Sequence, residues 1–302
     1  MKAILATGPQ SVHYADKAMP AVGRGQVLVH VLAAGVNPVD WKMLSHASST
    51  RPRTPGCDFS GVVAALGPGV HAFQLGDAVY GSLGVVADGT FAEYITGPAD
   101  FMARKPRSLS HEQAAAVPVA ATTAWQALFD YANVQAGQRV LVHAAAGGVG
   151  LFAAQLAKWK GAYVIGTASG RNEAFVRALG VDEFIDYGRT AFERALPAVD
   201  VVVDTVGGAT ADKSWAVLKK GGFFVSAVGA ANEQQALQHR VRAANFLVVP
   251  DASQLQQIGQ LLDAGQLRVH VQQTFPLSAA AEALDLSRQG HVRGKLVLTT
   301  PG

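Results

Sequence analysis

The sequence predicts an α/β protein of two domains, one rich in β-strands and one built on a doubly wound parallel sheet. Its 302 residues exceed the roughly 100 to 200 residues of a typical single domain. Up to about residue 110, short apolar runs are separated by Gly, Pro and Asp, whereas beyond it helical stretches alternate with apolar strands. We therefore expect a β-rich domain from residues 1–112, to which residues 248–302 return, and a nucleotide-binding domain from 113–247.

The strands of the first part are predicted from β-branched and apolar runs that end at turn-forming residues. They are expected at 26–36, 60–67, 77–82 and 89–97. Their irregular spacing is typical of a barrel-like domain.

The second part begins with an Ala-rich stretch, 111–132, that predicts one helix. Apolar strands separated by helix-like stretches follow, and this alternation predicts a parallel sheet. The strands are expected at 139–145, 163–169, 183–187, 199–206 and 222–228. The tail predicts a helix at 253–265, a strand at 267–275, a helix at 278–290 and a strand at 294–300.

Composition and charge exclude several classes of protein. Hydrophobic residues make up 49% and charged residues 16%, which favours a packed core over disorder. The net charge of +3 is spread without a basic tract, so no nucleic-acid partner is expected. No uncharged apolar run reaches the length of about 18 residues needed to span a membrane, and no signal peptide is recognisable. We expect a cytoplasmic protein without a membrane partner.

Ligands for a metal are scarce. The single cysteine, Cys57, excludes an intrachain disulfide and a multi-cysteine zinc site. The nine histidines lack ligand spacing, so no bound metal is predicted.

A glycine loop follows the strand at 139–145 and precedes an Ala-rich helix. Glycines let the backbone approach a pyrophosphate, and the N-terminus of the helix offers free N–H groups to phosphate. The pattern predicts a dinucleotide site; the alternative is a turn that only packs helix on strand. The loop residues assigned to the cofactor are Ala146, Gly147, Gly148 and Val149.

The residues after the second strand of this unit indicate which dinucleotide binds. An NAD site usually places Asp or Glu there to bind the ribose 2′-hydroxyl. Here Ser169, Gly170 and Arg171 occupy the position, and a guanidinium suits a 2′-phosphate. NADPH is predicted in preference to NADH; the alternative is that Arg171 is a solvated helix residue.

Six motifs along the whole chain are distinctive in combination: GVNPVDWK (35–42), PGCDFSGVV (55–63), GDAVYG (76–81), HAAAGGVG (143–150), DTVGG (204–208) and GHVRGKLVL (290–298). With them the sequence resembles the quinone oxidoreductase and alkenal/enone reductase branch of the medium-chain dehydrogenase/reductase superfamily. The resemblance implies a GroES-like β-rich catalytic domain and a Rossmann domain. Asn37 and the pair Cys57-Asp58 occupy the positions that hold zinc ligands in the related alcohol dehydrogenases, which implies zinc-free chemistry.

The resemblance also implies individual roles in the site. Asn37 and Lys42 would line the nicotinamide end and serve as catalytic donors, although Lys42 is alternatively a solvated surface residue. Tyr187 would join Ser169 and a basic group around the adenosine phosphate, where Arg171 replaces the lysine that the family usually carries. The remaining cofactor contacts implied are Thr123, Gly229 and Lys295.

The predicted reaction is hydride transfer from NADPH to a quinone or to the C=C bond of an enone, with stabilisation of the oxyanion that develops. Asp40 and Asp58 are read as caps of backbone groups or as an acid/base pair, and Cys57 as a small buried residue or part of the substrate pocket. Alternatives are reduction of enoyl thioesters, or a non-catalytic NADPH sensor or crystallin-like RNA-associated protein. The apolar strand at 246–249 predicts a homodimer.

Overall fold

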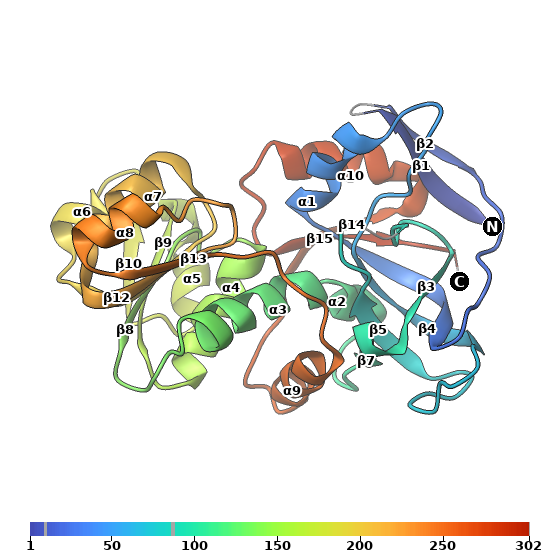
Figure 1. The fold of residues 1–302 in the computed structure, drawn as a ribbon, viewed down its shortest axis with the longest axis horizontal. Helices are drawn as coiled ribbons and strands as arrows, with labels where there is room; N and C mark the ends of the chain where they lie inside the picture. Colours follow the sequence, from blue (N-terminus) through green and yellow to red (C-terminus); the bar gives the residue numbers. More distant parts are fainter. Residues whose placement is uncertain (9–10, 86–87, 302) are drawn as a thin grey trace. The chain divides into compact units, whose positions relative to one another are not determined.

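The computed structural model describes residues 1–8, 11–85 and 88–301, which form two compact units (Figure 1). The first unit comprises Met1–Thr122, Val249–Gly265 and Val269–Gly302, and the second comprises Thr123–Val248 and Gln266–Arg268. The predicted α/β fold is confirmed. The first boundary falls at Thr122 and not at residue 112, because helix α2 (His111–Ala115) packs on strands of the first unit.

The first unit contains a two-stranded ribbon and a seven-stranded sheet. The ribbon pairs β1 (Lys2–Gly8) with β2 (Ser11–Asp16). The sheet has the order β14-β15-β3-β4-β5-β7, with β6 also paired to β3. Its strands are β3 (Gln26–Val36), β4 (Asp58–Leu66), β5 (Ala78–Ser82), β6 (Tyr94–Pro98), β7 (Met102–Arg104), β14 (Val271–Pro276) and β15 (Lys295–Thr299).

The late strand β15 lies within this sheet, between β14 and β3. It runs antiparallel to β3, with Leu296 opposite Val36, and parallel to β14. Helices α1 (Pro38–Lys42) and α10 (Ala280–Arg288) pack against each other, and α9 (Ala252–Asp263) packs on β7. The pairing of β15 with β3 places Lys295 beside the end of β3, where the next residue is Asn37.

The second unit is built on a six-stranded parallel sheet, ordered β10-β9-β8-β11-β12-β13. Numbered from its first strand this is the order 3-2-1-4-5-6 of dinucleotide-binding Rossmann sheets. The strands are β8 (Arg139–Val142), β9 (Tyr163–Ala168), β10 (Glu183–Asp186), β11 (Val199–Asp204), β12 (Leu218–Ser226) and β13 (Arg242–Asn245). Their apolar side chains form a core with Trp215 stacked on Phe224 at 4.3 Å between ring centroids.

The helical stretch 111–132 is divided, contrary to the single helix predicted. Pro118 has no N–H to continue a helix from α2, and it begins α3 (Pro118–Trp125), which leads into the π-helical turn η3 (Gln126–Tyr131). The other helices of this unit are α4 (Gly148–Trp159), α5 (Glu173–Ala178), α6 (Phe192–Ala195), α7 (Gly208–Ser214) and α8 (Glu233–His239). In the described part of the chain, no helix is both long and apolar enough to cross a bilayer.

The edge strand of the second unit lies earlier than predicted. β13 ends at Asn245, whose side chain bonds to the backbone of Ala231 in both directions, and residues 246–249 form no strand. Phe246 instead packs its ring on Tyr131, with 4.8 Å between centroids. The two edge strands of the sheet are therefore β10 and β13, and β13 ends before the predicted strand.

Candidate active site

Asn37 begins the short helix that carries the predicted catalytic residues. It follows β3 directly and caps α1, with Pro38 at the first helical position. Its backbone N–H donates to Oδ2 of Asp40 at 2.6 Å, and both residues are buried. Asp40 therefore caps a backbone group, as the structural interpretation of this residue expects.

A second carboxylate, Asp58, lies in a buried cluster with Asn37 and Lys295. Asn37 Nδ2 donates to Asp58 Oδ2 at 2.9 Å, and the backbone N–H of Val119 donates to Asp58 Oδ1 at 2.8 Å. Lys295 Nζ lies 3.4 Å from Asp58 Oδ2 and also donates to Asn37 Oδ1. The Lys295 and Asp58 side chains are 3% and 0% exposed. Burial raises the pKa of Asp58, while Lys295 and the hydrogen bond from Asn37 oppose the rise.

These contacts concern two of the predicted site residues. Lys295 was expected at the cofactor, and its ammonium group is turned to Asp58 and Asn37 inside the first unit. The Asn37 amide contacts both of these buried charged groups, through its Nδ2 and its Oδ1. Lys42 is exposed at the last residue of α1, with Nζ 5.5 Å from the Trp41 ring centroid.

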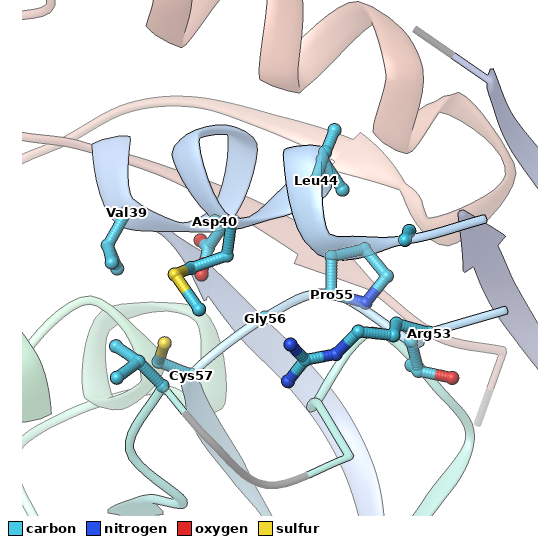
Figure 2. A pocket seen from close by; sticks show the side chains of 11 residues that line it. Val39, Asp40, Leu44, Arg53, Pro55, Gly56 and Cys57 are labelled. Atoms are coloured by element: carbon cyan, nitrogen blue, oxygen red, sulfur yellow. The ribbon is translucent and has the colours of Figure 1, made fainter. Parts of the chain in front are cut away.

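A pocket of the first unit lies beside this cluster (Figure 2). Asp40 and Cys57 line it, and Figure 2 shows the guanidinium of Arg53 directed toward Gly56 and Cys57. Burial raises the pKa of Asp40 to about 7, against the hydrogen bond from the Asn37 backbone. Burial and the two neighbouring carboxylates raise the pKa of the Cys57 thiol. The pocket thus combines a protonatable acid and a thiol that stays protonated with apolar walls from Val39, Met43, Leu44, Pro55 and Val85.

The glycine loop of the second unit fits the pyrophosphate of a dinucleotide. The N-cap of α4 is Gly147, and no side chain caps the N–H groups of the first turn, which includes Gly148 and Val149. At Gly150 a Cβ would lie 2.1 Å from the Ala144 carbonyl oxygen, so only glycine permits this tight turn. The cradle and the uncapped positive end of the helix suit an anion.

The predicted adenosine residues follow the carboxyl ends of neighbouring parallel strands and so share one edge of the sheet. Ser169 and the exposed Arg171 follow β9; Asn172 Nδ2 donates to Ser169 Oγ at 3.1 Å. Tyr187 follows β10, with its N–H on the Ala168 carbonyl at 3.2 Å and its side chain exposed.

The remaining predicted contacts lie at different places in the second unit. Gly229 follows β12 with a φ of +80°. Thr123 is buried in α3, which precedes the first strand of the sheet in sequence. Ala146 is buried and directly precedes Gly147, the N-cap of α4. The fold therefore groups the glycine loop with Ser169, Tyr187 and Gly229 at the carboxyl ends of strands, and places Thr123 on a helix.

Sequence reasoning missed two polar residues of this unit. His143, at the end of β8, is buried, with Nε2 2.8 Å from Ser214 Oγ and Nδ1 3.1 Å from Thr167 Oγ1. Burial lowers its pKa to about 4. Asp186, the last residue of β10, stands opposite Ala168 in the parallel register. A polar residue ending an apolar strand was the signal available for both.

The zinc positions of the related alcohol dehydrogenases do not form a metal site here. Among the described residues, no group of three or more His, Cys, Asp and Glu side chains is placed to hold a metal ion. Asn37 offers an amide, the Cys57 thiol resists deprotonation, and Asp58 is paired with Lys295. Zinc requires deprotonated sulfur, imidazole or carboxylate ligands, so this donor set does not fit it.

Comparison with known proteins defines the class. The alcohol dehydrogenase GroES-like domain family matches residues 23–107, and the zinc-binding dehydrogenase family matches residues 179–298. Mouse (Mus musculus) mitochondrial NAD(P)H oxidoreductase RTN4IP1 is 33% identical over 323 residues, covering 90% of this chain and 81% of that protein. The tomato (Solanum lycopersicum) 2-methylene-furan-3-one reductase is 32% identical, and the match covers 93% of this chain and 73% of that protein. The structure of a Coxiella burnetii quinone oxidoreductase superposes with a TM-score of 0.92 at 38% identity, and the match covers 100% of this chain and 99% of that one.

The chain therefore belongs to the medium-chain dehydrogenase/reductase superfamily, and the resemblance noted from its motifs is confirmed. It is an NAD(P)H oxidoreductase of that superfamily with quinone oxidoreductases among its structural neighbours. The predicted cytoplasmic location is contradicted, because mammalian and fungal relatives are named as mitochondrial. That expectation depended on the lack of a recognisable signal peptide and of a membrane-spanning run, and neither distinguishes the two compartments.

Proposed function

We propose that the chain is a zinc-independent, NADPH-dependent reductase that transfers hydride to a quinone or to the C=C bond of an α,β-unsaturated carbonyl. The observation that carries this proposal is the buried Asn37–Asp58–Lys295 cluster, in which Asn37 and Asp58 stand at positions that by resemblance correspond to zinc ligands in alcohol dehydrogenases. The Lys295 ammonium provides the positive charge next to Asp58. Without a Lewis acid to polarise an alkoxide, reduction of an already electron-poor acceptor is the chemistry that the residues favour.

Cofactor preference is argued from charge at the end of β9. Ser169, Arg171 and Tyr187 all carry donors, and a guanidinium forms forked, charge-assisted hydrogen bonds to phosphate. The glycine loop before α4 would hold the pyrophosphate, and its anion-binding geometry favours a dinucleotide in either oxidation state. NADPH, when bound, supplies the hydride.

The acceptor is assigned to the pocket of Figure 2, which is lined in part by residues of the segment 43–55 that follows α1. Its apolar side chains suit a flat quinone or enone ring, and Arg53 and Asp40 offer polar groups to the acceptor oxygen. Electrophilic acceptors of this kind add to thiolates, not to thiols. The raised pKa of Cys57 therefore protects the enzyme from alkylation by its own substrate.

The chain's own residues act by orientation and charge. Asn37 holds Asp58 and Lys295 in place beneath the pocket, so the helix α1 that carries Lys42 begins at a fixed point. Lys42 is assigned the stabilisation of the oxyanion that develops on the acceptor, because it is the cation of the GVNPVDWK motif and its exposed side chain ends α1, whose residues Val39 and Asp40 line the pocket. Enzymes of this kind depend mainly on such alignment and electrostatics.

A substrate panel tests the proposal. Oxidation of NADPH should be followed at 340 nm with ortho- and para-quinones, alkenals, cyclic enones and enoyl thioesters, with and without a chelator. We expect turnover of quinones or enones that is unchanged by chelation. Loss of activity on chelation would refute zinc independence. Tight NADPH binding without turnover of any acceptor would favour the non-catalytic sensor or RNA-associated protein, and turnover confined to enoyl thioesters would favour the third alternative.

A further inference from the structure

Asp186 places a carboxylate directly beside the loop that is expected to bind the adenosine end of the cofactor. A Cβ built on Gly170 would lie 2.5 Å from Asp186 Oδ2, so this oxygen packs against the backbone between Ser169 and Arg171. The strand pairing fixes the arrangement, because Asp186 is opposite Ala168 and the next N–H, that of Tyr187, donates to the Ala168 carbonyl.

The orientation of this carboxylate is also fixed from its own side. Its Oδ1 accepts the backbone N–H of Gly188 at 2.9 Å, which holds the side chain in a tight turn. Arg189 Nε lies 3.6 Å from Oδ2, but the Arg189 side chain is 88% exposed, and such solvated pairs screen a charge only weakly. Asp186 therefore presents a net negative charge at this edge of the sheet.

Nucleotide sites that select NAD carry an acid at the end of the second strand, where this chain has none. The parallel sheet supplies one from the neighbouring strand instead: β10 ends level with β9, and its last residue is Asp186. Two neighbouring strand ends thus carry opposite charges: Arg171 follows β9, and Asp186 ends β10.

We propose that Asp186 is a cofactor-specificity residue that limits the preference for NADPH by repelling the 2′-phosphate and accepting the 2′-hydroxyl of NADH. This inference depends on the proposed dinucleotide site in the second unit. It makes the chain a dual-cofactor enzyme in which Arg171 and Asp186 act in opposite directions on one ribose position.

The test substitutes Asp186→Asn, which removes the charge and keeps an oxygen for the Gly188 N–H. Asp200→Asn is the matched control: it makes the same charge change in the same sheet, at the amino end of β11, and the two aspartate side chains are 20% and 21% exposed. Dissociation constants for NADPH, NADH, adenosine 2′,5′-bisphosphate and AMP are measured by calorimetry at one low ionic strength. Asp186→Ser provides a second neutral variant that can still accept from Gly188.

We expect Asp186→Asn and Asp186→Ser to tighten NADPH and the bisphosphate by about tenfold, because a carboxylate repels a near-dianionic phosphate across partly screened space. NADH should weaken by about threefold to tenfold as the acceptor loses its charge, and Asp200→Asn should change every constant by less than about twofold.

An unchanged NADPH-to-NADH ratio in both Asp186 variants would overturn the proposal, as would a wild-type chain that binds none of the four probes. The fragment measurements need no acceptor. A ratio that shifts as expected in a chain that turns over no quinone or enone would therefore support Asp186 while refuting the proposed reaction.

Discussion

Replacing Lys295 with methionine tests whether the buried cluster is held by charge. Lys295 Nζ lies 3.4 Å from Asp58 Oδ2, and neither side chain is appreciably exposed. Methionine fills a similar volume but leaves Asp58 with only two neutral donors, Asn37 Nδ2 and the Val119 N–H. Removing one partner of a buried ion pair costs about 3 to 5 kcal/mol, because the remaining charge is buried without compensation.

The free energy of unfolding of the cofactor-free chain is measured by urea denaturation at pH 7 and pH 5, with tryptophan fluorescence and circular dichroism as parallel probes. Burial already raises the pKa of Asp58 above its unfolded value, and Lys295 opposes that rise. Loss of Lys295 therefore raises this pKa further. A group with a raised folded pKa contributes stability that is lost as pH increases through that pKa, so the deficit of Lys295→Met should shrink from pH 7 to pH 5.

The double variant Lys295→Met with Asp58→Asn removes both charges and should recover most of the loss. A deficit below about 1 kcal/mol in the single variant would refute the reasoning. So would an equal deficit at the two pH values, or a double variant as unstable as the single one.

Three further predictions concern the second unit. Arg171→Ala should weaken NADPH by about 10- to 150-fold, through loss of a charge-assisted contact, and barely change NADH; equal weakening of both in calorimetry would make Arg171 a structural residue. Burial lowers the pKa of His143 from 6.5 to about 4, so the free energy of unfolding should fall by about 3 kcal/mol as pH decreases from 6.5 to 4. His143→Gln should reduce this pH dependence in urea denaturation. An unchanged pH dependence would mean that other groups cause it. Pairing of the open edge of β13 with its mate should give a homodimer in light scattering, and a monomer at micromolar concentration would reject it.

The local parts of the fold could be predicted because their signals are contiguous in the sequence. The strand Gln26–Val36 has the predicted bounds, and the glycine loop stands between β8 and α4 as its pattern requires. The single helix predicted at 111–132 was wrong for a reason that is also local. The alanines of this stretch favour a helix, but Pro118 has no N–H to continue one, and the structure divides the stretch there. The strand predicted at 246–249 was wrong, because apolar residues alone do not show where the hydrogen-bonded pairing of a strand ends.

The candidate site could be predicted only in part, because its important contacts join distant residues. Lys295 meets Asn37 across 258 positions and Asp58 across 237, a proximity that follows from the pairing of β15 with β3. Asp186 could not be predicted from the residues that follow β9 along the chain, because it comes from the neighbouring strand β10, where it lies opposite Ala168. In both cases the sheet register, and not the local pattern, decides which side chains meet.

The position of β15 has a consequence for how the polypeptide is synthesised. A ribosome releases the chain from its N-terminus, so β3 and β4 emerge long before β15, which lies between β14 and β3. The second unit consists of residues 123–248 apart from Gln266–Arg268, so almost all of it is synthesised before β15. In the first unit β6 pairs with Gln26–His30 of β3, but the end of β3 at Ala33–Val36 lacks its partner strand, and Asp58 lacks its cation, until β15 is made. An uncovered strand edge beside an uncompensated acid is the state that a chaperone would have to shield until residues 295–299 arrive.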